Sequence, residues 1–259
     1  MLICTVRNCQ LPLRREEHRV VCGKGHSFDI ARSGYINLLQ PQDRRSKNPG
    51  DTAKAIAARR RIHDSGVTAP LLAGLEAFAR PSIDDVVLDA GSGEGFFLGS
   101  LAAHFGCSAH GVDISIPAVD SAAKRYPQCE WIVANADRYL PYSKASFSLV
   151  LSITGRLNAS EFRRVLQPDG RLIVAVPAPD DLIEIRGKGR NRVEHTIAAA
   201  ENFSLIQRER IAASAEFDAA AVNDVMHSIY RPLRSEPLRA MRLTFSLDLL
   251  EYRRTGHAR

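Results

Sequence analysis

The sequence predicts an α/β protein with a doubly wound sheet and a small N-terminal metal-binding module. From residue 85 onward, short apolar runs alternate with helical segments, which is typical of a parallel sheet flanked by helices. Three of the five cysteines lie within the first 22 residues and a histidine follows them closely. Such clustering of soft ligands indicates a metal site rather than a set of disulfides.

Length and composition agree with a folded, soluble protein. A chain of 259 residues has room for one large domain and one small one. The content of 45% hydrophobic and 25% charged residues excludes a disordered, collagen-like or membrane-spanning chain. No apolar run approaches the roughly 18 residues of a spanning helix, and the start does not resemble a secretory signal. With an odd cysteine count, we expect a reducing cytoplasm as the compartment.

The positive charge is concentrated at the start of the chain. Residues 1–64 contain 13 Lys or Arg and 6 Asp or Glu, whereas the remaining residues contain 22 and 23. An uneven field of this kind favours an anionic polymer as partner. The alternative interpretation is a solubilising surface.

Residues 1–36 are expected to form the metal-binding module, and residues 37–64 a basic loop and helical linker. A hairpin is predicted within residues 10–21, where turn residues separate two short apolar stretches. Residues 40–51 contain two prolines and a glycine, which indicates an exposed loop. A helix is predicted to start at Asp51 or Thr52, with Ala and Ile on one side and arginines around the other.

Residues 65–259 are expected to form the large domain. A helix is predicted from Thr68, with Pro70 in its first turn. Short apolar runs then predict strands, amphipathic stretches predict helices, and residues 167–170 predict a turn. The expected strands are 86–90, 108–114, 131–136, 147–153, 171–176, 203–211 and 241–250, and the expected helices are 96–105, 117–126, 159–166 and a segment near 217–229.

The first set of candidate ligands has the pattern Cys-x4-Cys-x12-Cys-x3-His. Zinc takes four such ligands at tetrahedral positions, and two close pairs bridged by a hairpin supply them. A module this small lacks the core to fold alone, so the metal would supply stability. The expected zinc ligands are Cys4, Cys9, Cys22 and His26, with His18 as a substitute if Cys4 does not reach.

A glycine-rich loop follows the first strand of the large domain, with Gly91, Gly93 and Gly95 two residues apart. Such a loop brings backbone N–H groups against a ligand at a helix N-terminus. Asp89 precedes it, where a carboxylate can face the ammonium of S-adenosylmethionine. Asp113 ends the second strand, 20 residues after Gly93, where it can hold both ribose hydroxyls. The pattern favours S-adenosylmethionine over a nicotinamide dinucleotide.

Two further sets of residues are candidates for binding. Asn135 or Asp137, after the third strand, could meet the polar edge of an adenine, or could simply form a turn. Basic residues of the linker could contact RNA phosphates, or could form a solvated surface. The first basic set is Arg44, Arg45, Lys47, Arg59, Arg60 and Arg61, and a later one is Arg186, Lys188, Arg190 and Arg192.

With these residues identified, nearly the full chain resembles the RlmA-type methyltransferases, which methylate N1 of a guanine in large-subunit ribosomal RNA. The resemblance lies in the Cys/Cys/Cys/His set and in six stretches of sequence. These stretches are HSFDIARSGYINLL, RRSKNPGD, AARRRIHDSG, VLDAGSGEGFF, GVDIS and AAKRYPQ. The run HSFDIARSGYINLL followed by NPGD is more specific than the glycine loop, which many methyltransferases share.

The resemblance implies a class I S-adenosylmethionine-dependent methyltransferase fold, with zinc in the N-terminal module and ribosomal RNA as partner. It implies cofactor contacts at Gly93 and Glu94, and at the positions of Thr68 and Asp181. It also suggests a homodimer. The chain departs from the family pattern by a first cysteine pair two residues wider and by Ile153-Thr154-Gly155-Arg156 in place of an Ile-Tyr-Ala-Pro-like stretch. Thr68 and Asp181 replace an aromatic residue and a histidine.

The expected reaction is attack of guanine N1 on the cofactor's methyl group, with an acceptor for the N1 proton. Candidate acceptors are Asp51, Glu94 and Asp181, and the residues do not distinguish among them. The target base should lie in a loop or be splayed out of a helix, because a paired base cannot reach the methyl group. Alternatives are a methyltransferase acting on a small molecule, a nicotinamide-dependent oxidoreductase and a catalytically silent RNA-binding zinc protein.

Overall fold

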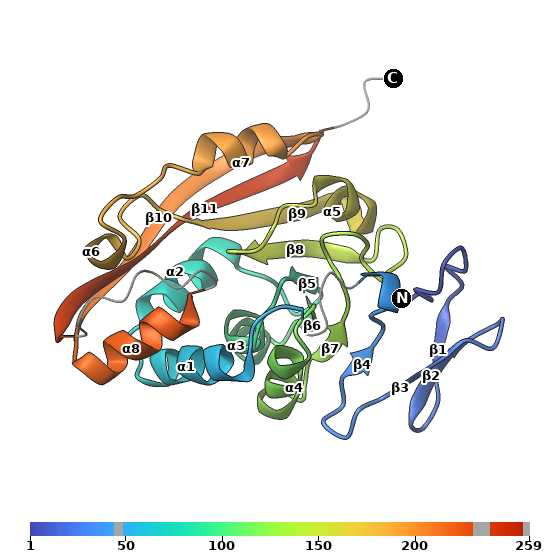
Figure 1. The fold of residues 1–259 in the computed structure, drawn as a ribbon. Helices are drawn as coiled ribbons and strands as arrows, with labels where there is room; N and C mark the ends of the chain where they lie inside the picture. Colours follow the sequence, from blue (N-terminus) through green and yellow to red (C-terminus); the bar gives the residue numbers. More distant parts are fainter. Residues whose placement is uncertain (44–48, 230–238, 256–259) are drawn as a thin grey trace.

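The computed structural model describes residues 1–43, 49–229 and 239–255. At its centre lies a sheet with the strand order β10-β11-β9-β8-β5-β6-β7-β4 (Figure 1). Strands β4 to β9 of this sheet run parallel to one another, and β11 runs antiparallel to both β9 and β10. Beside it lies a small antiparallel sheet of β1, β2 and β3. The predicted fold class is therefore confirmed.

The strands of the large sheet follow the predicted apolar runs closely. The small sheet consists of β1 (Leu13–Arg15), β2 (Arg19–Cys22) and β3 (Ser27–Asp29). The large sheet consists of β4 (Ile36–Asn37), β5 (Val86–Ala90), β6 (Ser108–Asp113), β7 (Glu130–Val133), β8 (Phe147–Ile153), β9 (Leu166–Pro177), β10 (Phe203–Phe217) and β11 (Met241–Arg254).

The helices begin at the side chains that the sequence marks as caps. Thr52 accepts a hydrogen bond from the Ala55 amide at the start of α1, and Pro70 lies in the first turn of α2. Ser115 caps α4 in the same way as Thr52. The helices are η1 (Pro41–Asp43), α1 (Ala53–Asp64), α2 (Ala69–Ala79), α3 (Phe96–Phe105), α4 (Ile116–Arg125), α5 (Ala159–Val165), α6 (Ile183–Arg186), α7 (Val193–Ala199) and α8 (Ala219–Ser228).

The two faces of the large sheet are covered by different layers. Side chains such as Val87 and Leu149 pack with α2, α3 and α4, whereas Leu88 and Val150 pack with α5 and α7. The N-terminal module belongs to the second layer, because Val20, Phe28 and Cys22 are buried in that same cluster. Successive strand residues point to opposite faces, so both faces of this sheet are apolar.

Three features differ from the sequence-based expectations. The turn expected at residues 167–170 is a bulge within the continuous strand β9, where the pairing with β8 shifts register. The short helices α6 and α7 were not predicted. The domain boundary expected at residue 36 falls inside β4, which pairs with β7 at the edge of the large sheet. Within the described ranges, no helix combines the length and hydrophobicity that crossing a membrane requires.

Candidate functional site

The four predicted zinc ligands lie together in the N-terminal module. Their ligand atoms are all within 4.8 Å of one another. The Cys9 and Cys22 sulfurs are 3.8 Å apart, and the His26 Nδ1 lies 3.4 Å from the Cys22 sulfur. Zinc bonds of about 2.3 Å to sulfur and about 2.0 Å to nitrogen place two sulfurs about 3.8 Å apart and a sulfur and a nitrogen about 3.5 Å apart. The four side chains therefore fit a tetrahedral zinc ion.

The wide first cysteine pair is accommodated by the backbone. Asn8 and Gln10 both adopt positive φ angles, of 61° and 51°, which tighten the turn that brings Cys9 back to Cys4. The second pair is closed by a turn in which the Gly25 amide donates to the Cys22 carbonyl. Both pairs thus form compact knuckles, and no substitution by His18 is needed to complete the set.

The glycine loop lies beyond the carboxyl end of β5. Gly91 and Gly93 have φ angles of 90° and 56°, which favour glycine. The amides of Gly91 and Ser92 donate to the Val112 carbonyl of β6, at 2.8 and 3.1 Å. These bonds fix the loop over the ends of two adjacent strands, where parallel α/β sheets bind their ligands.

Asp89 is buried at the start of this loop, with 2% of its surface exposed. Its Oδ1 accepts no hydrogen bond from the described residues, and the same holds for the hydroxyls of Ser92 and Ser152. Burial, with Asp113 and Glu94 adding negative charge, raises the pKa of Asp89 to about 8. A buried carboxylate without a partner fits a cationic group of a ligand, as the ammonium of S-adenosylmethionine would supply.

Asp113 ends β6 next to this carboxylate. Its two oxygens accept hydrogen bonds from the amides of Gly93 and Ser115, at 2.9 and 2.8 Å. Burial raises the pKa of Asp113 even though these two bonds lower it. The pair of bonds ties the glycine loop to the N-terminus of α4 and orients Asp113 at the carboxyl edge, where the sequence predicted a ribose-binding residue.

The segment that departs from the family pattern borders the glycine loop. Thr154 has a φ angle of 55°, which is unusual for a β-branched residue. The Gly155 Cα lies 3.7 Å from the position that a Cβ on Gly91 would take. Arg156 points outward and lies 3.5 Å from the Asp137 carboxylate. Residues 153–156 thus border the glycine loop.

Other predicted cofactor residues have protein partners. The Asn135 side chain donates to the Asp43 carbonyl, at 2.8 Å, and accepts from the Asp137 amide. Thr68 is buried, and its hydroxyl lies 2.8 Å from Nδ1 of His63. Asp181 is buried beyond the end of β9 and accepts a hydrogen bond from the Ser246 amide. Their proposed contacts with a cofactor stay predictions.

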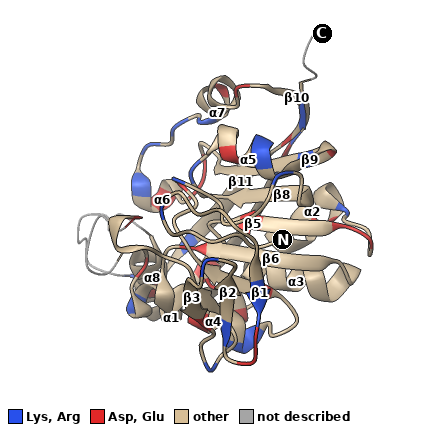
Figure 2. Ribbon diagram, turned by 90° about the vertical axis from the view of Figure 1, so that its right-hand side faces the viewer, with Lys and Arg blue, Asp and Glu red and all other residues tan. Residues whose placement is uncertain are grey.

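The predicted RNA-binding arginines of α1 are held by other side chains. Arg59 pairs with Asp51 and Glu94, and Arg61 pairs with Asp224 of α8 through two hydrogen bonds. Arg60 donates to the Ser121 hydroxyl. Arg44, Arg45 and Lys47 lie outside the described residues. Figure 2 shows further basic segments on β1 and beside α6. Exposed basic residues there and in the rest of the module include Arg7, Lys24, Arg32, Lys188, Arg190 and Arg192.

His63 is a residue that the sequence-based analysis did not single out. Its Nε2 lies 3.2 Å from Oε1 of Glu94, inside the glycine loop. His63 and Arg59 are four residues apart and so lie on one face of α1. The spacing of Arg59 and His63 can be seen in the sequence. It indicates a shared site only when the folded chain shows Glu94 opposite both side chains.

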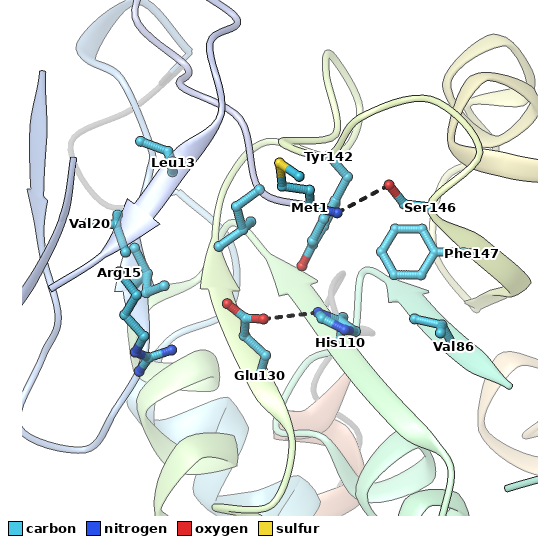
Figure 3. A pocket seen from close by; sticks show the side chains of 12 residues that line it. Met1, Leu13, Arg15, Val20, Val86, His110, Glu130, Tyr142, Ser146 and Phe147 are labelled. Atoms are coloured by element: carbon cyan, nitrogen blue, oxygen red, sulfur yellow. Dashed lines mark hydrogen bonds and ion pairs between the residues drawn. The ribbon is translucent and has the colours of Figure 1, made fainter. Parts of the chain in front are cut away.

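A cavity of about 270 Å³ lies at the opposite edge of the sheet, between the module and the amino ends of β5 and β7 (Figure 3). His110 and Glu130 point into it and form an ion pair of 3.2 Å. Because it is at the other end of the strands from Asp89, this cavity is separate from the glycine-loop site.

Comparison with known families matches both parts of the chain. Residues 87–170 match a model described as a methyltransferase domain, and residues 3–47 match one described as the N-terminal region of RlmA. A solved complex of the Haloferax volcanii Trm112 methyltransferase activator with a provisionally assigned methyltransferase has the same fold. Its TM-score is 0.53 at 20% identity, over 80% of this chain and 100% of that one. The fold and the glycine loop therefore define a class I methyltransferase.

Two curated relatives give the family. A 23S rRNA (guanine(748)-N(1))-methyltransferase of Streptomyces fradiae is 34% identical, over 85% of this chain and 81% of the relative. A protein of Bacillus subtilis, named provisionally as a 23S rRNA (guanine-N(1)-)-methyltransferase, is 31% identical over 79% and 75%. The chain belongs to the family of RlmA-type 23S rRNA (guanine-N1) methyltransferases. The family match and the four-ligand cluster support S-adenosylmethionine and zinc as its cofactors.

Replacing one zinc ligand should remove the metal and weaken the module. Cys9→Ala is expected to lower the zinc content well below one ion per chain and to lower the melting temperature, since structural zinc stabilises small modules strongly. Metal analysis by mass spectrometry and thermal unfolding measure the two effects. Cys107→Ala is the control, because this buried cysteine lies outside the cluster. Full zinc content in Cys9→Ala would contradict the assignment.

Affinity for S-adenosylmethionine should rise with pH on the acidic side of neutrality. Below its pKa of about 8 Asp89 is largely protonated, and binding the cofactor's ammonium requires the carboxylate. Binding therefore releases a proton, and the affinity should increase up to about tenfold per pH unit between pH 6 and 7.5. Calorimetry in two buffers of different ionisation enthalpy measures the release. Asp89→Asn should bind weakly and without this pH dependence, and an equal dependence in both proteins would contradict the role of Asp89.

Proposed function

We propose that this chain transfers a methyl group from S-adenosylmethionine to N1 of a guanine in 23S ribosomal RNA. The main support for this proposal is that the RlmA-type module and the methyltransferase domain occur in the same chain. The buried carboxylate of Asp89 and the partly buried one of Asp113 suit the cofactor's ammonium and ribose. The named activity of the relatives supplies the substrate and the atom.

The work of the protein in this reaction is mainly positioning. Bound S-adenosylmethionine supplies an electrophilic methyl group on a sulfonium. The residues after β8 and β9 would border the incoming base, because both strands end at the carboxyl edge with β5. Holding the base in line with the methyl group gives most of the rate increase that such a transfer requires.

RNA would be held by basic residues outside α1. Arg7, Lys24 and Arg32 of the module are exposed, and so are Lys188, Arg190 and Arg192 between α6 and α7. Phosphate contacts from such residues would position the RNA without reading its sequence. A homodimer with a shared RNA surface is part of this proposal, and it rests on the family resemblance alone.

The experiment that tests the function uses the purified zinc-loaded protein. It is incubated with methyl-labelled S-adenosylmethionine and unmodified 23S rRNA, and the RNA is digested to nucleosides for mass spectrometry. Labelled N1-methylguanosine is the expected product. Methylation of another nucleoside would overturn the substrate atom, and RNA binding without any product would favour a silent RNA-binding protein. Labelling of small molecules only would favour the small-molecule alternative.

Of the three candidate proton acceptors we favour Asp181, which is also ion-paired, with Arg186 at 3.3 Å, but whose pKa is raised. Glu94 and Asp51 are both paired with Arg59, and burial raises the pKa of Glu94 less than His63 and Arg59 lower it. Burial raises the pKa of Asp181 above its ordinary value, although the Ser246 amide and Arg186 lower it. A carboxylate with a raised pKa accepts a proton more readily. We therefore assign to Asp181 the removal of the guanine N1 proton.

The variant Asp181→Asn should lower kcat by about 100-fold or more, with little change in the affinity for S-adenosylmethionine. The pH–rate profile should lose its acidic limb, because that limb reports the ionisation of the acceptor. Asp180→Asn, at the neighbouring position, is the control. If Asp181→Asn instead weakens cofactor binding and leaves kcat unchanged, Asp181 is a cofactor ligand and not the proton acceptor.

A further inference from the structure

The carboxylate of Glu94 is buried inside the glycine loop and is held by two side chains of α1. Glu94 is 5% exposed and lies between Gly93 and Gly95. Arg59 Nη1 lies 3.3 Å from its Oε2, and His63 Nε2 lies 3.2 Å from its Oε1. Each carboxylate oxygen of Glu94 is therefore in contact with a side chain of α1. Asp89, whose Oδ1 has no partner among the described residues, is the carboxylate that suits the cofactor's ammonium.

Arg59 contacts three other residues, at the start of its own helix, in the glycine loop and at the end of α8. Besides Glu94, its Nη2 contacts Asp51 Oδ2 at 2.8 Å and donates to the Ser228 carbonyl at 2.8 Å. Asp51 is in turn bonded through its carbonyl to the Ser115 hydroxyl, next to the ribose-binding end of β6. The guanidinium also lies over the loop, since a Cβ on Gly93 would be 3.5 Å from its Nη1. A planar guanidinium with several donors is suited to such a junction.

His63 is fixed in the orientation that brings Nε2 to Glu94. Its Nδ1 lies 2.8 Å from the Thr68 hydroxyl, at the start of α2. Its ring stacks on Phe96 of α3, with the ring centres 3.9 Å apart and the planes at 7°. These two contacts leave the imidazole little freedom to turn away from the loop.

We propose that Arg59 and His63 are positioning residues for the cofactor, which act by fixing Glu94 and with it the glycine loop. This inference rests on the proposed use of S-adenosylmethionine. Three glycines with positive φ angles lie in the loop. Because glycine has no Cβ, such a loop has many accessible conformations, and it must be held in its binding conformation to bind tightly. Glu94 anchors the loop to α1, and the Arg59 guanidinium together with the contact from His63 Nε2 compensates for burying its charge. Arg59 thereby belongs to the cofactor site, although its position in a basic run suggested a phosphate contact.

The test measures cofactor binding by calorimetry in the intact, zinc-loaded protein. Arg59→Met should weaken the affinity for S-adenosylmethionine by about 10- to 100-fold, as expected when a buried charged group loses its partner. KM for the cofactor should rise in the same proportion, while KM for RNA and its dependence on salt stay unchanged. Lys54→Met removes an exposed positive charge from the same helix and should leave cofactor affinity unchanged.

A double-mutant cycle tests whether Arg59 acts through Glu94. Glu94→Gln alone should weaken cofactor binding, and the double variant should bind no more weakly than Arg59→Met. Effects that multiply would instead show a direct contact between Arg59 and the cofactor and would overturn the positioning role. For His63, Gln retains a donor toward Glu94 and should restore most of the affinity that His63→Leu loses. Equal losses in these two variants would overturn the role of His63.

The remaining outcomes are equally decisive. Unchanged cofactor affinity in Arg59→Met, with a raised KM for RNA, would overturn the proposal and make Arg59 a phosphate contact. If Arg59→Met does not fold, Arg59→Lys is measured instead. Lysine keeps the positive charge but not the several donors of the planar guanidinium, so it should still lose affinity for S-adenosylmethionine relative to the wild type, but less than about 10- to 100-fold. Calorimetry also separates this inference from the substrate proposal. A wild-type protein that binds S-adenosylmethionine but forms no N1-methylguanosine would contradict only the substrate.

Discussion

Parallel pairing of β5 with β6 is the constraint on which the cofactor site depends. The register sets Asp89 opposite Gly111 and Ala90 opposite Val112, so both strands end at the same edge and bring Asp89 and Asp113 together. Glycine at position 111 also leaves room for the Trp131 ring and the Ser92 hydroxyl. Strands β8 and β9 run in the same direction, and the segments that follow them reach that edge as well. The chemistry is therefore concentrated at one edge by the direction of the strands.

Several carboxylates at one edge of the sheet repel one another, and Arg59 of α1 reduces this repulsion by pairing with Glu94. Burial, with the nearby charges of Asp113 and Glu94, raises the pKa of Asp89. Arg59 balances the charge of Glu94, whereas the charge of Asp89 requires protonation or a cationic ligand to balance it. Part of the positive charge in the first quarter of the chain is thus used inside the protein. The helix that carries it, which the sequence predicted as part of a linker, contacts α4 and α8.

The features that the sequence predicted correctly are those determined over short distances along the chain. Thr52 and Pro70 mark helix starts through local hydrogen bonding and a fixed φ angle, and the cysteine pairs lie within single turns. The partners of Arg59 could not be predicted, because Glu94 and Ser228 lie 35 and 169 residues away and meet it only in the folded chain. The continuous strand β9 is a similar case. Pro168 and Gly170 favour a turn locally, but Leu166 on one side pairs with β8 and Arg171 on the other pairs with β8 and β11, so the segment is enclosed within one strand.

The N-terminal module contributes to the large domain as well as to its own metal site. Cys4 and Cys22 are buried in the same cluster as Ile132 and Val150 of the large sheet, so metal ligands and sheet side chains share one core. The Ile3 amide donates to the Pro141 carbonyl, and β4 extends the edge of the sheet beside β7. On this face of the large sheet, the module covers one part and helices α5 and α7 cover another. Loss of the metal would expose apolar surface of the large sheet to water, which couples the zinc site to the stability of the strands that carry Asp89 and Asp113.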